Sequence, residues 1–482
     1  MNAPLLIARE EWRFWIRSRL ASAASLLALL LVMVSLITTS ARLSAEHDAR
    51  ESLQTTAEET FKAQPGRHPH RMVHYGHYVF RTPAPLASID PGIDPYTGTV
   101  IFLEGHKQNS ATFSPLYAGA QAGPLAQLTP ALVYQILVSL LLIVVGYASL
   151  AREREGRTDR QLFTSALKFQ DLWLGKVLAL AGLAGVLLVP LIIASFGVLG
   201  AGESVFIIAF FVAGYALYLL VWCLIIVAAS ARAKAPAAAL LVLVSAWVGL
   251  SILAPRGASS VVETARPMAG KIESDLELAQ ALRSAGDGHN ANDPAFAKLR
   301  ANLLEEYGVD RVEDLPVNFR GIVAQEAEAS LTETMNRFAE QRMEQERVQA
   351  DTLSLLSFAS PGLAIRSLSI AAAGTDLAHH HRFLREAEAA RFDFVQGLNK
   401  LHAEELDYTD DINRSSDAAA EQRTRVSAEN WRLLNDFTFQ PASAGTRFLR
   451  SLWPLGVLLL WAAAAAWFGL RATKQGAENL DG

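Results

Sequence analysis

The chain has 482 residues, of which 51% are hydrophobic and 19% are charged, and its formal net charge is -5. The apolar residues are grouped in long runs, which indicates a membrane protein rather than a set of soluble domains. The small net charge argues against nucleic acid as the main partner. The one cysteine, Cys223, lies in an apolar run, so disulfides and cysteine-based zinc sites within a single chain are excluded.

Residues 1–19 are basic and amphipathic. One helical face carries apolar residues and another carries arginines, namely Leu5, Ala8, Trp12, Trp15 and Ile16 against Arg9, Arg13 and Arg17. We expect a cytoplasmic elbow helix lying on the inner leaflet; the alternative is a charged flank that only sets topology. The following run, Leu20–Thr39, is longer than a signal-peptide core and lacks a clean small-x-small cleavage site, which favours an uncleaved anchor.

Six apolar runs are long enough to cross a hydrocarbon core of ~30 Å as helices. They are Leu20–Thr39, Ala131–Leu150, Val177–Leu199, Val205–Ala229, Ala237–Ala254 and Leu452–Leu470. Basic residues before the first run, after the second and fourth, and after the last lie on one side if both termini are cytoplasmic. The sequence therefore predicts an all-α polytopic membrane protein with six transmembrane helices.

The predicted divisions are an elbow at 1–19, spans at 20–39 and 130–150, a cytoplasmic coupling loop at 151–176, spans within 177–254, a last span at 452–470, a cytoplasmic tail at 471–482, and periplasmic segments at 40–129 and 255–451. The first periplasmic segment begins as a helical stalk, Ala41–Lys62, and continues with β-like runs at Val73–Phe80 and Thr99–Leu103. We expect both segments, inserted after spans 1 and 5, to form one large, mainly helical periplasmic domain with small β content.

The second periplasmic segment carries helix start and stop signals. Asp293 with Pro294 begins one helix and Gly308 ends it, and Thr375 with Asp376 caps a later one. A long amphipathic pattern covers Asn318–Ala350. The run Leu353–Ala373 rivals the predicted spans, but its proline, arginine and serines make it a costly crossing. We expect an interfacial or domain-core helix pair broken before Pro361.

Sequence signatures of common enzymes are missing. The chain has no GxxxxGK[ST], no HExxH and no GxSxG, and Gly175-Lys176 lacks the earlier glycine of a phosphate-binding loop. We therefore expect a non-catalytic chain that binds no cofactor itself.

Histidines gather in two places in the periplasmic segments. These are His68, His70, His74 and His77 in one group and His379, His380 and His381 in the other. Imidazoles at such spacings can bind Zn²⁺ or Cu²⁺, but three successive helical histidines point in different directions. We interpret both groups as polar surface residues and predict no metal site, with His74 and His77 as weak candidates.

The cytoplasmic loop holds charges of alternating sign between two spans. The candidate coupling residues are Arg152, Glu153, Arg154, Glu155, Gly156, Arg157, Asp159, Arg160 and Phe163. A solvated loop whose cations only fix orientation is one interpretation. Apolar Leu162, Phe163 and Leu167 and the interfacial Trp173 favour the other, a coupling helix that docks into a groove of an ATPase.

The order of basic elbow, span, large outer segment, span and EREGRT…LGK resembles the ABC-2 type transporter permeases. Glu153-Arg154-Glu155-Gly156 and Gly175-Lys176 match the E-R-E-x-G-T and G-K elements of that family, while Thr158 comes one residue late and TSALKFQ replaces the usual small-residue and proline turn. A subset of the family with a large extracytoplasmic domain of unassigned role is similar at HYGHYVFR, IDPGIDPYTG, FLEGHKQN, DLPVNFRG, SPGLAIRSLS and AGTD.

The resemblance implies a multi-pass permease subunit of the bacterial inner membrane, with both termini cytoplasmic. It implies a dimer with an identical or sister permease, and cytosolic ATPase subunits that carry ATP and Mg²⁺. Export or extraction of a substrate toward the periplasm is the expected function. The alternative is mechanotransmission, in which ATP-driven motion passes to a periplasmic partner without transport of cargo; a passive membrane anchor is a third interpretation.

Overall fold

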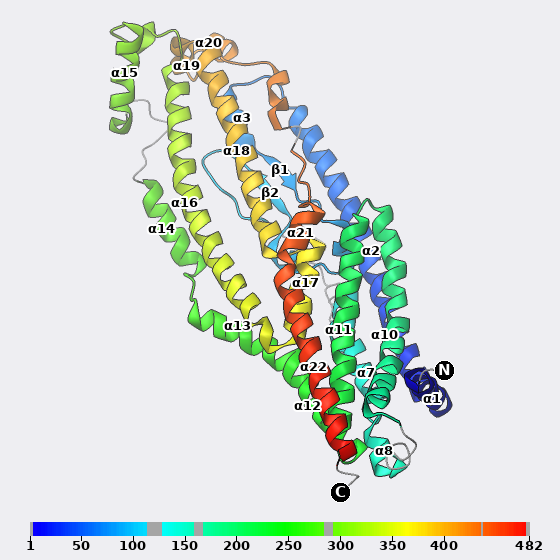
Figure 1. Ribbon diagram of the computed structural model, residues 1–482. Helices are drawn as coiled ribbons and strands as arrows, with labels where there is room; N and C mark the ends of the chain where they lie inside the picture. Colours follow the sequence, from blue (N-terminus) through cyan, green and yellow to red (C-terminus); the bar gives the residue numbers. More distant parts are fainter. Residues whose placement is uncertain (1–2, 113–127, 159–166, 284–292, 435–436, 479–482) are drawn as a thin grey trace.

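The computed structural model describes residues 3–112, 128–158, 167–283, 293–434 and 437–478. Most of these residues are helical, as the sequence predicts, and the described strands form one antiparallel pair (Figure 1). The amino-terminal elements are α1 (Ala3–Ser18), α2 (Leu20–Lys62), α3 (Pro69–Tyr75), β1 (His77–Phe80), α4 (Asp94–Thr97), β2 (Val100–Leu103), α6 (Pro130–Leu132), α7 (Ser139–Gly146) and α8 (Ala151–Glu155). The later elements are α10 (Phe169–Gly200), α11 (Val205–Arg232), α12 (Pro236–Val248), α13 (Ala254–Ala265), α14 (Lys271–Arg283), α15 (Ala297–Tyr307), α16 (Phe319–Leu355), α17 (Pro361–Ala373), α18 (Leu377–Glu405), α19 (Tyr408–Asn413), α20 (Ala418–Arg423), α21 (Ala444–Arg450) and α22 (Leu452–Glu478).

Six described helices are long and apolar enough to cross a membrane. They are Ala21–Lys62, Pro130–Glu155, Phe169–Gly200, Val205–Arg232, Pro236–Ala265 and Leu452–Gln475. Each coincides with one of the six apolar runs to within one residue at the start of the run, so the prediction of six spans is confirmed. A short π-helical stretch joins α6 to α7 and another joins α12 to α13, which makes each pair one continuous span.

Helix α11 lies at the centre of the bundle and packs against α7, α10, α12, α17 and α22. It is apolar on all sides, as a helix surrounded by others must be. Of the 18 consecutive residues that are most apolar in α11, 61% are buried. The same fraction is 28% for α2 and 22% for α12–α13, so these helices lie at the edge of the bundle. The described ends of the chain and α8 lie at one end of this bundle (Figure 1).

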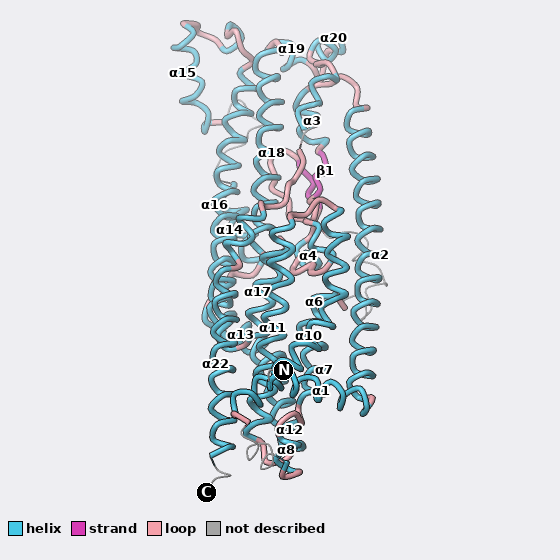
Figure 2. The backbone as a smooth tube through the Cα atoms, turned by 45° about the vertical axis from the view of Figure 1, so that its right-hand side comes forward, coloured by secondary structure: helices cyan, strands magenta, loops and turns pink. Residues whose placement is uncertain are grey.

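A distal domain extends from the opposite end of the bundle and contains α3, β1, β2, α14–α16 and α18–α20 (Figure 2). Its main core joins Phe61, Val73 and Ile101 to Phe383 and Trp431, so the two long segments fold together, as expected. Helix α2 continues from the bundle into this domain without a break.

The strands pair from His77↔Leu103 to Phe80↔Val100. The β-like run predicted at Val73–Phe80 is wrong in its first part, because residues up to Tyr75 belong to α3. Gly76, with a φ of 69°, ends that helix and turns the chain into β1.

The helix caps read from the sequence are confirmed. Asp293 accepts a hydrogen bond from the Ala295 amide, and Gly308 takes the left-handed conformation at the end of α15. Asp376 likewise caps α18, whereas the Thr375 hydroxyl donates to the Asp90 carbonyl oxygen and is not part of the cap.

The run Leu353–Ala373, which rivals the predicted spans in the sequence, is broken before Pro361 as expected. Helix α16 ends at Leu355, and α17 begins at Pro361 with Ser360 as its N-cap. Helix α17 packs against α11 and α22. Its buried residues therefore belong to the bundle core rather than to the core of the distal domain.

Candidate functional site

The charged loop begins with α8, which is fixed to the end of α11. The backbone amides of Leu150 and Ala151 donate to Ser230 Oγ at 2.9 and 3.0 Å. The Arg154 guanidinium donates to two carbonyl oxygens at the end of α11, at 2.6 and 2.8 Å. Because these bonds satisfy amides and carbonyls that helix ends leave open, α8 is an attached part of the bundle.

Four side chains form a charge cluster beside α8: Glu11, Arg152, Glu153 and Lys176. Lys176 Nζ lies 2.5 Å from Glu11 Oε1 and 2.9 Å from Glu153 Oε1, and Arg152 donates to Glu11 at 2.6 Å. The Lys176 and Glu11 side chains are only 3% and 4% exposed. The two cations and two anions neutralise each other, as burial of charge requires.

Each outer member of the cluster has a further contact. The Arg152 guanidinium lies 3.9 Å from the centre of the Phe14 ring, and Thr158 Oγ1 donates to Glu153 Oε2 at 2.6 Å. The cluster thus joins α1, α8 and α10, which are far apart in the sequence.

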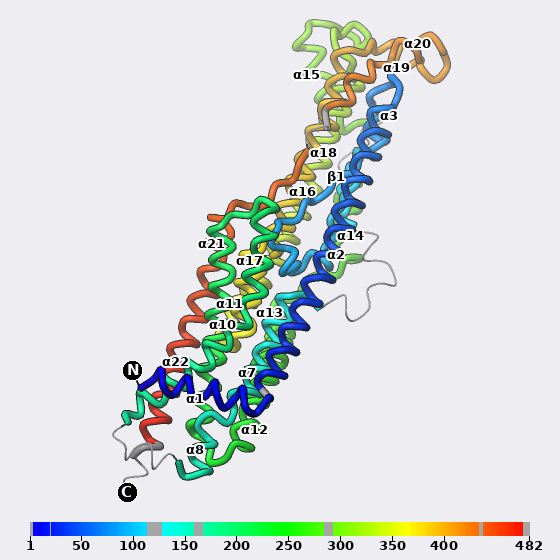
Figure 3. The backbone as a smooth tube through the Cα atoms, turned by 90° about the vertical axis from the view of Figure 1, so that its right-hand side faces the viewer, coloured from blue at the N-terminus to red at the C-terminus, as the bar shows by residue number. Residues whose placement is uncertain are grey.

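Gly175 explains how α1 comes close enough to reach this cluster. A Cβ atom at this position would lie 2.6 Å from Ile7 Cβ and 2.9 Å from the Pro4 carbonyl oxygen. In Gly175-Lys176, the glycine therefore permits the close approach of two helices and the lysine supplies the charge beside it. Figure 3 shows α1 lying across the foot of the bundle.

Residues 104–266 match the family model described as ABC-2 family transporter protein. The chain contains an ABC-2 transporter domain. Residues 272–440 match a second model, described as Domain of unknown function (DUF3526). No curated protein and no solved structure matches the chain. Members of the family matched by residues 104–266 are generally the non-catalytic membrane component of ABC transporters and work with an ABC ATPase.

The structure divides the predicted coupling residues into two groups. Arg152, Glu153 and Arg154 turn toward the bundle and make the contacts above, whereas Glu155, Gly156 and Arg157 are exposed at the end of α8. Arg157 has a φ of 57°. The remaining candidates, Asp159, Arg160 and Phe163, lie outside the described residues.

Sequence reasoning missed the inner part of the charge cluster. Lys176 was expected in a solvated loop, but α10 begins at Phe169 rather than Val177 and carries Lys176 into the protein. Glu11 was not singled out, although an acidic residue beside Trp12 and Trp15 on an otherwise apolar elbow face was the available signal.

The predicted apolar face of the elbow is only partly buried. Trp15 is buried, and Ala8 and Trp12 pack against the bundle core. Leu5 and Ile16 are 56% and 61% exposed and face away from it.

Two buried polar contacts lie at the end of the bundle away from α8. Arg447, in α21, binds Glu203 through both oxygens, at 2.5 and 2.9 Å, and both side chains are at most 4% exposed. Glu203 follows the end of α10, so this pair joins the far end of α10 to the segment that leads into α22.

The second contact is a chain of hydrogen bonds that starts at Asp90, in the segment between β1 and α4. The Ser369 hydroxyl donates to Asp90, the Tyr215 and Ser369 oxygens lie 2.9 Å apart, and Gln135 donates to the Tyr215 hydroxyl at 3.0 Å. It joins Asp90 to α17, α11 and the second span.

The distal domain also contains a groove of about 1120 Å³ between α14, α16, α18 and the segment from β2 to Ala111. Its lining mixes aromatic and charged side chains, among them Phe102, Phe338, Phe392, Glu340, Arg342 and Arg385.

The histidines that the sequence groups together separate in space. His68 and His402 donate to Asp411 at 3.1 and 2.7 Å in a buried cluster. Burial opposes the charge on Asp411, but these bonds and the nearby Arg320 lower its pKa below the usual value. His77 is buried against Phe61.

The histidines at the start of α18 are buried rather than on the surface, which corrects their interpretation as surface residues. His379 contacts Asp376, and His381 contacts Glu346 at 2.7 Å. They point to different partners, as successive helical residues should.

Proposed function

We propose that this chain is the permease subunit of an ATP-driven exporter or extractor in a bacterial inner membrane, with both termini in the cytoplasm. Partner ATPase subunits would hold ATP and Mg²⁺ and dock at residues 152–170, which begin in α8, and on α1. A second permease, identical or related, would complete the transmembrane unit. The charge cluster carries this proposal, because it joins the docking loop to both the elbow and a membrane-spanning helix.

The cluster gives a route for motion through the membrane. A displacement of α8 acts on α1 and α10 together, because Glu11, Glu153 and Lys176 share their contacts. The 32 residues of α10, at about 1.5 Å per residue, correspond to about 48 Å. Its far end reaches the Glu203–Arg447 pair. The partner's ATP-bound and ATP-free states would thus bias two arrangements of the bundle and distal domain.

Two glutamates of α8 allow one experiment to distinguish ATPase docking from folding, because Glu155 is exposed and Glu153 belongs to the charge cluster. Glu155→Lys reverses an exposed charge and should reduce co-purification of the ATPase while leaving the melting temperature of the permease unchanged. Glu153→Gln changes a residue of the charge cluster and should lower the melting temperature. Wild-type recovery of the ATPase with Glu155→Lys would contradict docking at this position.

Mechanotransmission is the second candidate, and α2 favours it. This helix has 43 residues, about 65 Å, and connects the bundle to the distal core through Phe61 without a break. Such a helix can transmit movement to a periplasmic partner. Purified permease and ATPase in proteoliposomes distinguish the two functions: net substrate movement supports transport, whereas partner-stimulated ATP hydrolysis without any transported species supports mechanotransmission.

A further inference from the structure

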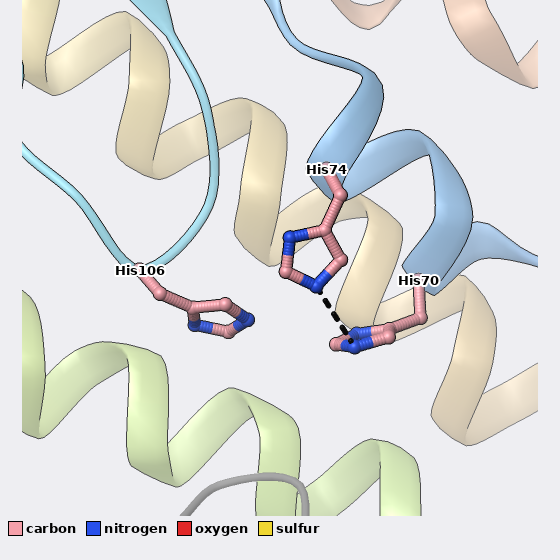
Figure 4. Close-up of side chains that lie close together, drawn as sticks. All are labelled: His70, His74 and His106. Atoms are coloured by element: carbon pink, nitrogen blue, oxygen red, sulfur yellow. Dashed lines mark hydrogen bonds between the residues drawn. The ribbon is translucent and has the colours of Figure 1, made fainter.

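Three histidines from two segments of the distal domain meet at one point. His70 and His74 lie four residues apart on α3 and so share one face of that helix. His106 lies in the turn after β2. Ligand atoms of the three rings lie within 4.8 Å of one another, and Figure 4 shows the rings facing a common centre.

The spacing of the ring nitrogens suits a metal ion. His70 Nε2 and His74 Nε2 are 3.2 Å apart. Zinc–nitrogen bonds of about 2.0–2.1 Å in a tetrahedron separate two ligand nitrogens by about 3.3 Å. Only a small adjustment would bring His106 to the same separation.

His106 is oriented by a buried carboxylate. Its Nδ1 lies 2.8 Å from Glu328 Oε2, and its backbone amide donates to the same oxygen at 3.2 Å. Glu328 is fully buried and paired with Arg391 at 2.5 Å. A carboxylate on one ring nitrogen turns the other nitrogen toward a metal and raises its basicity, which is the usual support of a zinc-binding histidine.

We infer that the distal domain binds one Zn²⁺ through His70, His74 and His106, with Glu328 as the residue that positions His106. His74 is exposed and the other two rings are half-buried, so solvent can supply the fourth ligand. The ion would join α3 to the turn after β2. This inference replaces the expectation of a chain without a metal, keeps His74 as a ligand and removes His77.

The second histidine group differs in its burial and in its balance of charge. His68, His402 and Asp411 are all buried. Asp411 also faces the guanidinium groups of Arg320 and Arg414, at 3.7 and 3.3 Å. Positive charge already balances this carboxylate, so the group is a buried ion-pair network rather than a cation site.

The test uses the full chain, purified in detergent without a histidine tag and freed of metal by a chelator. Zn²⁺ is titrated by calorimetry, Co²⁺ is used as a visible reporter of tetrahedral coordination, and melting is followed with and without Zn²⁺. Wild type should bind one Zn²⁺ per chain and melt at a higher temperature with it. His47→Ala, at a histidine that is 61% exposed on α2, is the matched control and should behave as wild type.

His74→Ala and His106→Ala should lose the Co²⁺ spectrum and the zinc-dependent rise in melting temperature. Glu328→Gln keeps all three imidazoles and should weaken zinc binding by about 10–100-fold. His74 is exposed, so its substitution should leave the metal-free fold intact even if the other variants do not fold. Zinc binding retained by His74→Ala, or Cu²⁺ bound where Zn²⁺ is not, would overturn the proposal.

Discussion

Lys176 shows at the level of single residues how buried charge ties distant segments together. Its ammonium group is buried between Glu11 and Glu153, and Arg152 completes a neutral set. Such a set contributes little net stability compared with apolar residues, but loss of one member leaves an unbalanced charge. Its contribution is to fix which helices contact each other.

Lys176→Met should therefore destabilise the protein by about 3–5 kcal/mol, because it leaves the buried Glu11 and the half-buried Glu153 with one cation. The double variant Lys176→Met with Glu11→Gln restores the balance and should be more stable than the single one. Denaturant unfolding of the purified proteins in one detergent measures both. A single variant as stable as wild type would show that solvent reaches the cluster.

His380 gives the distal domain a dependence on pH. Burial, together with Arg81 and His381, lowers its pKa from 6.5 to about 4. Between these values the unfolded chain binds a proton that the folded chain does not, so stability falls as the pH drops from 6.5 to 4, by up to about 3 kcal/mol. His380→Gln should remove this loss, measured as the difference in melting temperature between variant and wild type at each pH.

The comparison with wild type is needed because Asp94 acts in the opposite direction. Burial raises its pKa from 3.8 to about 6, so it favours the folded state at the acidic end of that window. Asp94 is present in both proteins and cancels in the difference. Identical pH profiles for both proteins would contradict the assignment to His380.

At the scale of elements, close packing of α1 on α10 is what brings Glu11 to the cluster. The glycines of α10 differ in this respect. Gly175 touches α1, whereas a Cβ at Gly185, in the same helix, meets nothing within 4 Å.

Gly175→Ala should cost about 1–3 kcal/mol through overpacking and should increase proteolysis of α1 as the elbow separates. Gly185→Ala is the matched control. It should be neutral or stabilise the helix by up to about 1 kcal/mol, because alanine has the higher helix propensity. Equal melting temperatures for the two variants would mean that α1 moves without cost.

For the whole molecule, the arrangement of termini and domains makes one topological prediction. Both described ends and α8 lie opposite the distal domain (Figure 1). Positive loops at that end predict that it faces the cytoplasm. The native Cys223 is fully buried, so single introduced cysteines can be labelled selectively.

Glu306→Cys, on exposed α15, should react with a membrane-impermeant maleimide in intact cells with a permeable outer envelope. Arg157→Cys, at the end of α8, should react only after the inner membrane is opened. Both sites are exposed in the structure, so their reactivity reports the side of the membrane on which they lie and not their burial. Labelling of Arg157→Cys in intact cells would reverse the topology and remove the proposed ATPase site.

The sequence alone determined the six spans and the caps at Asp293, Gly308 and Asp376. These depend on hydropathy over about twenty residues or on one turn of backbone, which are local properties. Tertiary structure decided the rest. The bond between Lys176 and Glu11 joins residues 165 positions apart. His106 lies beside His70 and His74 only because β2 pairs with β1, the strand that follows α3. Such contacts depend on how whole helices pack, and no local pattern in the chain records that.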